Sequence, residues 1–115
     1  MNGIDAVVML APFAQPFSRG GTLSGIEVPV LFQLGGTDDW ITPALETLCL
    51  FAAIEAPACM VVYRGAGHLA WTDLQTDFHA ATAAATAAFL DDVFAGRLPK
   101  QSILASPQTE RKECR

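Results

Sequence analysis

Basic residues, cysteines and long apolar runs are all scarce in this sequence. Seven Lys and Arg residues stand against twelve Asp and Glu residues, which gives a net charge of −5. This acidic balance argues against nucleic acid, or an anionic membrane surface, as the main partner. No apolar run reaches the roughly 18 residues that a membrane-spanning helix requires. We therefore expect no transmembrane segment.

The cysteines are too few and too scattered for a disulfide framework or a zinc site. Cys49 and Cys59 are expected to be ordinary buried thiols and Cys114 a thiol in the C-terminal tail, as in a reducing compartment. The N-terminal residues lack the basic segment and the longer apolar core of a secretory signal. A cytoplasmic location is therefore the default expectation.

The 115 residues, of which 51% are hydrophobic, suffice for one domain with a modest core. Short apolar runs at 5–10, 28–34 and 59–63 predict buried strands. Helices are predicted from Thr42-Pro43 to about residue 56 and over 75–95, the second ending at Gly96. Apolar strands joined by a crossover helix indicate an α/β fold with about three parallel strands and two main helices.

Residues 97–115 differ in composition from the rest of the chain. They are polar, their basic residues outnumber the acidic ones, and they show no apolar periodicity. The sequence therefore predicts a domain over 1–96 and a mobile polar tail over 97–115.

Polar residues follow two of the expected strands, at the sheet edge where parallel α/β proteins place their working groups. The second strand continues into GGTDDW, residues 35–40, and the third into GAGH, residues 65–68. Neighbouring strands would bring an acid beside His68. A carboxylate that accepts a ring N–H fixes the histidine tautomer, so that the other ring nitrogen can act as a general base. Alternatively, these acids and this histidine are ordinary loop residues.

The segments LGGTDDWITP (34–43) and VVYRGAGHLAWTD (61–73) resemble the C-terminal part of the α/β-hydrolase family. The similarity is greatest to its dienelactone-hydrolase and platelet-activating-factor-acetylhydrolase-like lipase/esterase branch, and DAVVMLAP (5–12) extends it. Gly36, Asp39 and Pro43 match the family's acid loop; Gly65, Gly67 and His68 match its histidine loop. The resemblance implies a partial α/β-hydrolase fold in which Asp39 orients His68, the general base and acid. Asp38 is the alternative acid, although it breaks the spacing to Pro43.

The resemblance further implies serine-dependent hydrolysis of a small ester or lipid-like substrate, without a cofactor or a metal. Trp40 and Trp71, which flank the acid and the base, would line the substrate pocket or belong to the core. The family's order is nucleophile, acid, histidine, with the serine in a G-x-S-x-G elbow, and this chain contains no such motif. We therefore expect the serine to lie outside this chain. The chain alone should be inactive, and a sheet edge should self-associate or bind the N-terminal half.

Two other interpretations stay open at this stage. Gly65-x-Gly67-x-x-Ala70, with Asp91 a little over 20 residues further on, matches a dinucleotide-binding fingerprint. That motif requires a helix that starts within it and a strand that ends at the acid. Alternatively, the chain is a non-catalytic interaction domain that keeps the hydrolase half-fold as a scaffold.

Overall fold

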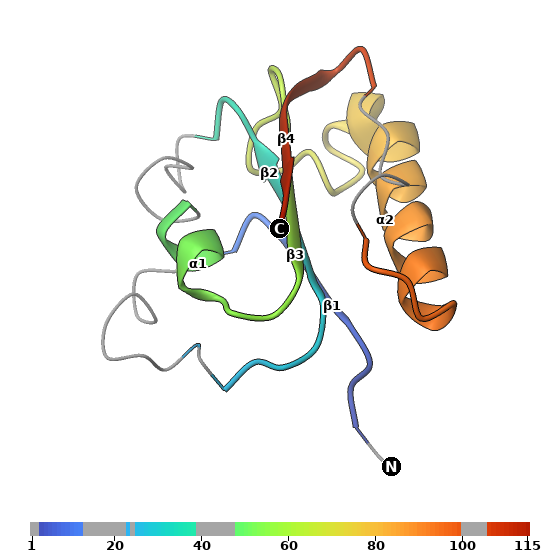
Figure 1. Cartoon of the computed structure of the whole chain (residues 1–115). Helices are drawn as coiled ribbons and strands as arrows, with labels where there is room; N and C mark the ends of the chain where they lie inside the picture. The colour runs from blue at the N-terminus through green and yellow to red at the C-terminus, as the bar shows by residue number, and fades with distance from the viewer. Residues whose placement is uncertain (1–2, 13–22, 24, 39–47, 100–105) are drawn as a thin grey trace.

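The fold is known from a computed structural model, which describes residues 3–12, 23, 25–38, 48–99 and 106–115. Four strands form one sheet in the order β1-β2-β3-β4 (Figure 1). They are β1 (Val7–Leu10), β2 (Val30–Gly35), β3 (Ala58–Tyr63) and β4 (Thr109–Cys114). The first three are parallel, and β4 runs antiparallel beside β3. The predicted α/β class and parallel order of the three strands are therefore confirmed.

Two helices cover opposite faces of this sheet (Figure 1). Helix α1 (Leu48–Ala53) packs on the face that carries Phe32 and Met60. Helix α2 (His79–Phe94), which follows directly on the 3-10 turn η3 (Thr76–Phe78), packs on the face that carries Leu31 and Val61. Since every residue of β2 and β3 is buried, alternate side chains supply the two cores, as expected of a strand covered on both faces.

The ends of the predicted helices agree only in part with the structure. The long helix lies where the sequence placed it, and Gly96 follows it with a φ of 72°, which suits the left-handed C-terminal position that glycine favours. Asp92, buried within α2, pairs with Arg97 at 3.0 Å just beyond the helix end. Helix α1 includes Leu48–Ala53, whereas the predicted start at Thr42-Pro43 lies outside the described residues.

The predicted tail contains a strand that the sequence reasoning missed. Thr109–Cys114 forms β4, and it pairs with β3 from Cys59↔Cys114 to Tyr63↔Thr109. Its sequence, TERKEC, has no apolar alternation, and none of its residues is fully buried. The domain therefore extends past residue 96 to include this strand.

The expectation of free Cys59 and Cys114 thiols is wrong, because these two residues form a disulfide between β3 and β4. Cys49 is the free cysteine, and it is exposed rather than buried. Arg115, directly after β4, donates hydrogen bonds to the carbonyls of Phe51 and Ile54 at the end of α1. The C-terminal strand is thus fastened on one side to β3 and at its end to α1.

Candidate functional site

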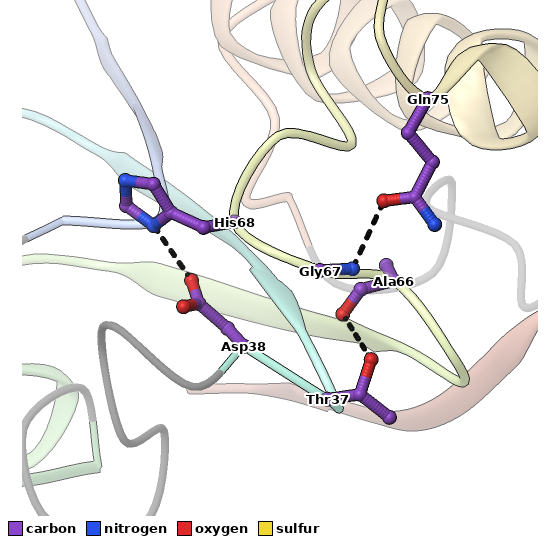
Figure 2. A network of polar contacts seen from close by, with 6 residues as sticks. All are labelled: Thr37, Asp38, Ala66, Gly67, His68 and Gln75. Atoms are coloured by element: carbon purple, nitrogen blue, oxygen red, sulfur yellow. Dashed lines mark hydrogen bonds and ion pairs between the residues drawn. The ribbon is translucent and has the colours of Figure 1, made fainter.

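His68 and Asp38 form an ion pair beyond the carboxyl ends of two neighbouring strands (Figure 2). Asp38 follows β2 by three residues and His68 follows β3 by five. Nδ1 of His68 lies 2.8 Å from Oδ2 of Asp38. The Asp38 side chain is 2% exposed and that of His68 is 28% exposed. The pair therefore combines a buried acid with an imidazole that solvent can reach.

The register of β2 and β3 explains why these two loops meet. Gly35 lies opposite Tyr63 at the end of the parallel pair, and the backbone N–H of Gly36 donates to the Tyr63 carbonyl at 2.8 Å. Thr37 then donates both its N–H and its hydroxyl to the carbonyl of Ala66, each at 3.0 Å. These bonds tie the residues just before Asp38 to the residues that precede His68.

Gln75 braces the histidine loop from the other side (Figure 2). Its Oε1 accepts a hydrogen bond from the N–H of Gly67 at 3.1 Å, and its Nε2 donates to the carbonyl of Gly65 at 3.4 Å. The side-chain amide of Gln75 thus holds the backbone of Gly65 and Gly67, which precede His68 in the loop. Sequence reasoning missed Gln75, because a glutamine just before a helix carries no motif.

A glycine is required at position 35 because the loop after β2 lies directly against the loop after β3. A Cβ atom at this position would collide with the backbone carbonyl of Ala66, the same carbonyl that accepts from Thr37. A collision with backbone can be relieved only by moving one loop away from the other. The glycine therefore sets the spacing on which the His68–Asp38 contact depends.

The chemistry of the pair follows from its hydrogen bond. An ionised carboxylate only accepts, so Nδ1 of His68 is the donor and carries the ring proton. The lone pair of the neutral ring then lies on Nε2. Asp38 also stabilises the imidazolium that forms when Nε2 takes up a proton. The arrangement is that of an oriented general base.

The structure brings together one of the two candidate acids with the predicted histidine. Asp38, the alternative acid, contacts His68; Asp39 and Trp40 lie outside the described residues. Trp71 is described and packs edge-on against Tyr63, with ring centroids 6.1 Å apart. Its buried Nε1 has no hydrogen-bond partner among the described residues.

Trp71 also lines an open groove of about 540 Å³ between α2 and the end of β1. The described residues of this groove include Gln33, Thr86 and Leu10, but not His68. Gln33 is fully buried at its floor, where its Oε1 accepts from the Tyr63 hydroxyl at 2.6 Å and its Nε2 donates to Thr86 at 2.7 Å. This polar network is satisfied internally and belongs to the packing of α2 on the sheet.

The glycine motif lacks the geometry that a dinucleotide site requires. After Gly65 and Gly67 the chain forms turns, and α2 begins only at His79. Asp91 lies within α2 instead of at the end of a strand. The helix N-terminus that would face a pyrophosphate therefore does not follow this loop directly.

The described residues contain no group of three His, Cys, Asp or Glu side chains that could hold a metal ion. No helix among them is long and apolar enough to cross a membrane.

Comparison of the sequence with models of known protein families found no match, and comparison with curated proteins found no significant match. The resemblance to α/β-hydrolases therefore stays a prediction from the motifs themselves.

Proposed function

We propose that this chain supplies the acid–base pair of a serine-dependent carboxylic ester hydrolase, with His68 as the base and Asp38 as its orienting acid. The observation that carries the proposal is the 2.8 Å contact between a buried carboxylate and a partly exposed imidazole beyond the carboxyl ends of the parallel strands β2 and β3. The order of the acid and histidine loops along the chain supports the same assignment.

In this reaction Nε2 of His68 accepts the proton of an attacking serine hydroxyl while the oxygen bonds to the ester carbonyl carbon. Asp38 stabilises the resulting imidazolium, which then returns the proton to the departing alkoxide. A water molecule repeats the sequence on the acyl-enzyme and frees the acid. His68 is thus base and acid in turn, and Asp38 holds one ring orientation throughout.

The proposal places the serine outside the 115 residues, since no G-x-S-x-G elbow occurs within them. Without that serine and its oxyanion donors, the pair lacks the groups that supply most of the rate enhancement. The purified chain should therefore hydrolyse p-nitrophenyl esters no faster than its His68→Ala variant.

The test begins with the coding DNA upstream of the Met1 codon, where the proposal expects an in-frame strand followed by G-x-S-x-G. The protein expressed from that longer frame should hydrolyse p-nitrophenyl esters. Its kcat/KM should fall by roughly 10³-fold or more in His68→Ala and in Asp38→Asn. Asp73→Asn is the matched control, because it removes an exposed carboxylate from the same loop region, and its activity should be unchanged.

Three results would overturn the proposal. One is an upstream frame without a nucleophile segment, and another is an active longer protein that tolerates both His68→Ala and Asp38→Asn. The third is robust ester hydrolysis by the 115-residue chain itself, lost in His68→Ala, which would place the nucleophile within this chain.

A further inference from the structure

One residue, Gln108, fastens the histidine loop at both of its ends. Strand β4 begins at the end of the sheet where the loops after β2 and β3 lie (Figure 1). Just before it, the backbone carbonyl of Gln108 accepts a hydrogen bond from the Arg64 N–H at 2.7 Å. The Gln108 side chain donates from Nε2 to the Asp77 carbonyl at 2.9 Å. Because Arg64 precedes His68 in the chain and Asp77 follows it, these two bonds close the loop that carries the imidazole.

Strand β4 also lies against the acid loop. The Glu110 carboxylate occupies the space that a Cβ atom at Gly36 would need. Gly36 in turn donates its N–H to the Tyr63 carbonyl, and Tyr63 pairs with Thr109 of β4. The start of β4 is therefore in contact with both of the loops whose meeting forms the acid–base pair.

The side chains of β4 contribute little to keeping it in the sheet. Four of its six residues are charged and none is fully buried, so the strand removes little apolar surface from water. The ion pair between Arg111 and Glu113 is 51% and 45% exposed on its two partners, and such a pair contributes little to stability. The other attachments are the backbone bonds to β3, the Arg115 contacts with α1 and the Cys59–Cys114 disulfide. Of these attachments, only the disulfide is covalent and only the disulfide responds to a reductant.

We propose that the Cys59–Cys114 disulfide is a redox switch for the acid–base pair, and that Gln108 is the positioning residue through which it acts. Cys114 is the more accessible cysteine, because Cys59 is 0% exposed and Cys114 is half-buried. A thiolate of a small dithiol attacks the Cys114 sulfur, forms a mixed disulfide and releases the Cys59 thiolate, which takes up a proton. The second thiol of the reductant then displaces Cys114 as a thiol and closes a cyclic disulfide. Two electrons and two protons have then passed from the dithiol to the chain.

Reduction should change the site through the attachment of β4. A strand with little buried apolar surface opens locally at a lower free energy than the core, and it separates from β3 along its whole length once the covalent link is gone. Gln108 then leaves with it, and the histidine loop loses its fastening at Arg64 and at Asp77. In such open states Nδ1 of His68 is no longer held against Asp38. The inference rests on the proposed function in treating His68 as the base, and it adds the regulation of the same site.

The first test compares the oxidised chain with the chain reduced by dithiothreitol, using NMR of the ¹⁵N-labelled protein. A Cys49→Ser background removes the free cysteine, so that Cys59 and Cys114 are the only cysteines present. Reduction should abolish the low-field Nδ1 proton of His68. The amide signals of β1, at the far edge of the sheet, should keep their chemical shifts because the parallel part of the sheet stays folded.

Two amides report directly on the attachment of β4. Ala58 donates its N–H to the Arg115 carbonyl at 2.9 Å, and Arg64 donates to the Gln108 carbonyl at 2.7 Å. These bonds lie at the two ends of the pairing between β3 and β4. Both amides should exchange with solvent about tenfold faster or more after reduction, since local opening of β4 exposes them.

Gln108→Ala tests the positioning role in the oxidised chain, where the disulfide is intact. The variant removes the bond to Asp77 and keeps the backbone bond to Arg64, so the fold should persist. The loss of one hydrogen bond should make the His68 ring proton exchange with solvent about 2- to 10-fold faster. Arg111→Ala is the matched control, because it removes an exposed ion pair from the neighbouring strand, and it should leave the ring proton unchanged.

A reduced chain, with both thiols shown by alkylation, that keeps its His68 ring proton or the slow exchange of Ala58 and Arg64 would overturn the switch. So would reduction that also abolishes the β1 signals, because the disulfide would then support the whole fold. A Gln108→Ala variant with an unchanged ring proton, or one matched by Arg111→Ala, would overturn the positioning role. None of these readouts requires ester hydrolysis. The absence of an upstream nucleophile would therefore overturn the proposed function and leave these results unaffected.

Discussion

The His68 imidazole contacts Asp38 because the loops that follow β2 and β3 are joined by hydrogen bonds to the carbonyls of Tyr63 and Ala66. The pair is therefore a product of strand register. Gly36 and Thr37 bond to the histidine loop, and the next residue, Asp38, turns inward until only 2% of its side chain is exposed. The predictions below follow from this arrangement and from the packing that supports it.

Gly35→Ala should disrupt the site through the backbone. The added Cβ would meet the Ala66 carbonyl, and relieving that contact should lower the free energy of unfolding by about 2 kcal/mol. Gly25→Ala is the matched control, since nothing lies within 4 Å of a Cβ placed there, and it should change stability by well under 1 kcal/mol. Urea denaturation measures both. Equal stabilities would show that the loops are not closely packed at Gly35.

The disulfide should contribute strongly to stability. It joins residues 55 apart in the sequence, and closing a loop of that length stabilises a fold by about 4 kcal/mol in the chain-entropy model. Cys114→Ser should therefore lower the free energy of unfolding by about 2–4 kcal/mol, measured in urea.

Cys49→Ser is the control for this prediction, because Cys49 is a free, exposed cysteine, and it should have little effect. Alkylation of the unreduced, denatured chain should label Cys49 alone. Labelling of all three cysteines would contradict the disulfide.

Tyr63 should make the fold sensitive to alkaline pH. Burial raises the pKa of its phenol above the usual value of about 10. Above about pH 10 the Tyr63 phenol stays protonated in the folded chain and loses its proton in the unfolded chain. The contribution of Tyr63 to the free energy of unfolding is therefore fully present below about pH 10. That contribution is lost as pH rises through the raised pKa, by at most about 1.4 kcal/mol per pH unit.

Two measurements check this prediction. Tyr63 is the only tyrosine in the chain, so tyrosinate absorbance follows it alone and should appear only well above pH 10 or on unfolding. In Tyr63→Phe the free energy of unfolding should fall less steeply as pH rises above about 10. It should also cost about 1–3 kcal/mol at neutral pH, because Gln33 loses its donor. An ordinary phenol titration in the folded chain would contradict the burial argument.

The sheet was predictable where apolar runs are continuous. The runs that became β2 and β3 are buried on both faces, and such strands are recognisable from composition alone. Strand β4 was not predictable, because TERKEC has no period-two pattern. The disulfide was missed for the same reason: Cys114 lies opposite Cys59 only if the C-terminal residues return to the sheet.

The sequence predicted that His68 lies beside an acid of the loop after β2, and Asp38, the alternative acid, is in contact with it; Asp39 lies outside the described residues. The positions of the two polar loops followed from parallel topology, since parallel strands end at the same edge. The contact of Asp38 with His68 depends on how Gly36 and Thr37 bond to Tyr63 and Ala66, and no spacing rule contains that information. Gln75 was unpredictable, since its contacts with Gly65 and Gly67 are set by a turn.

The most direct test of the account is the NMR signal of the His68 ring proton in the ¹⁵N-labelled chain. We expect a low-field proton on Nδ1, protected from exchange with solvent, in the wild type and in Asp39→Asn, and its loss in Asp38→Asn. A signal that survives Asp38→Asn, or that disappears in Asp39→Asn instead, would contradict the assignment of Asp38 as the acid that orients His68.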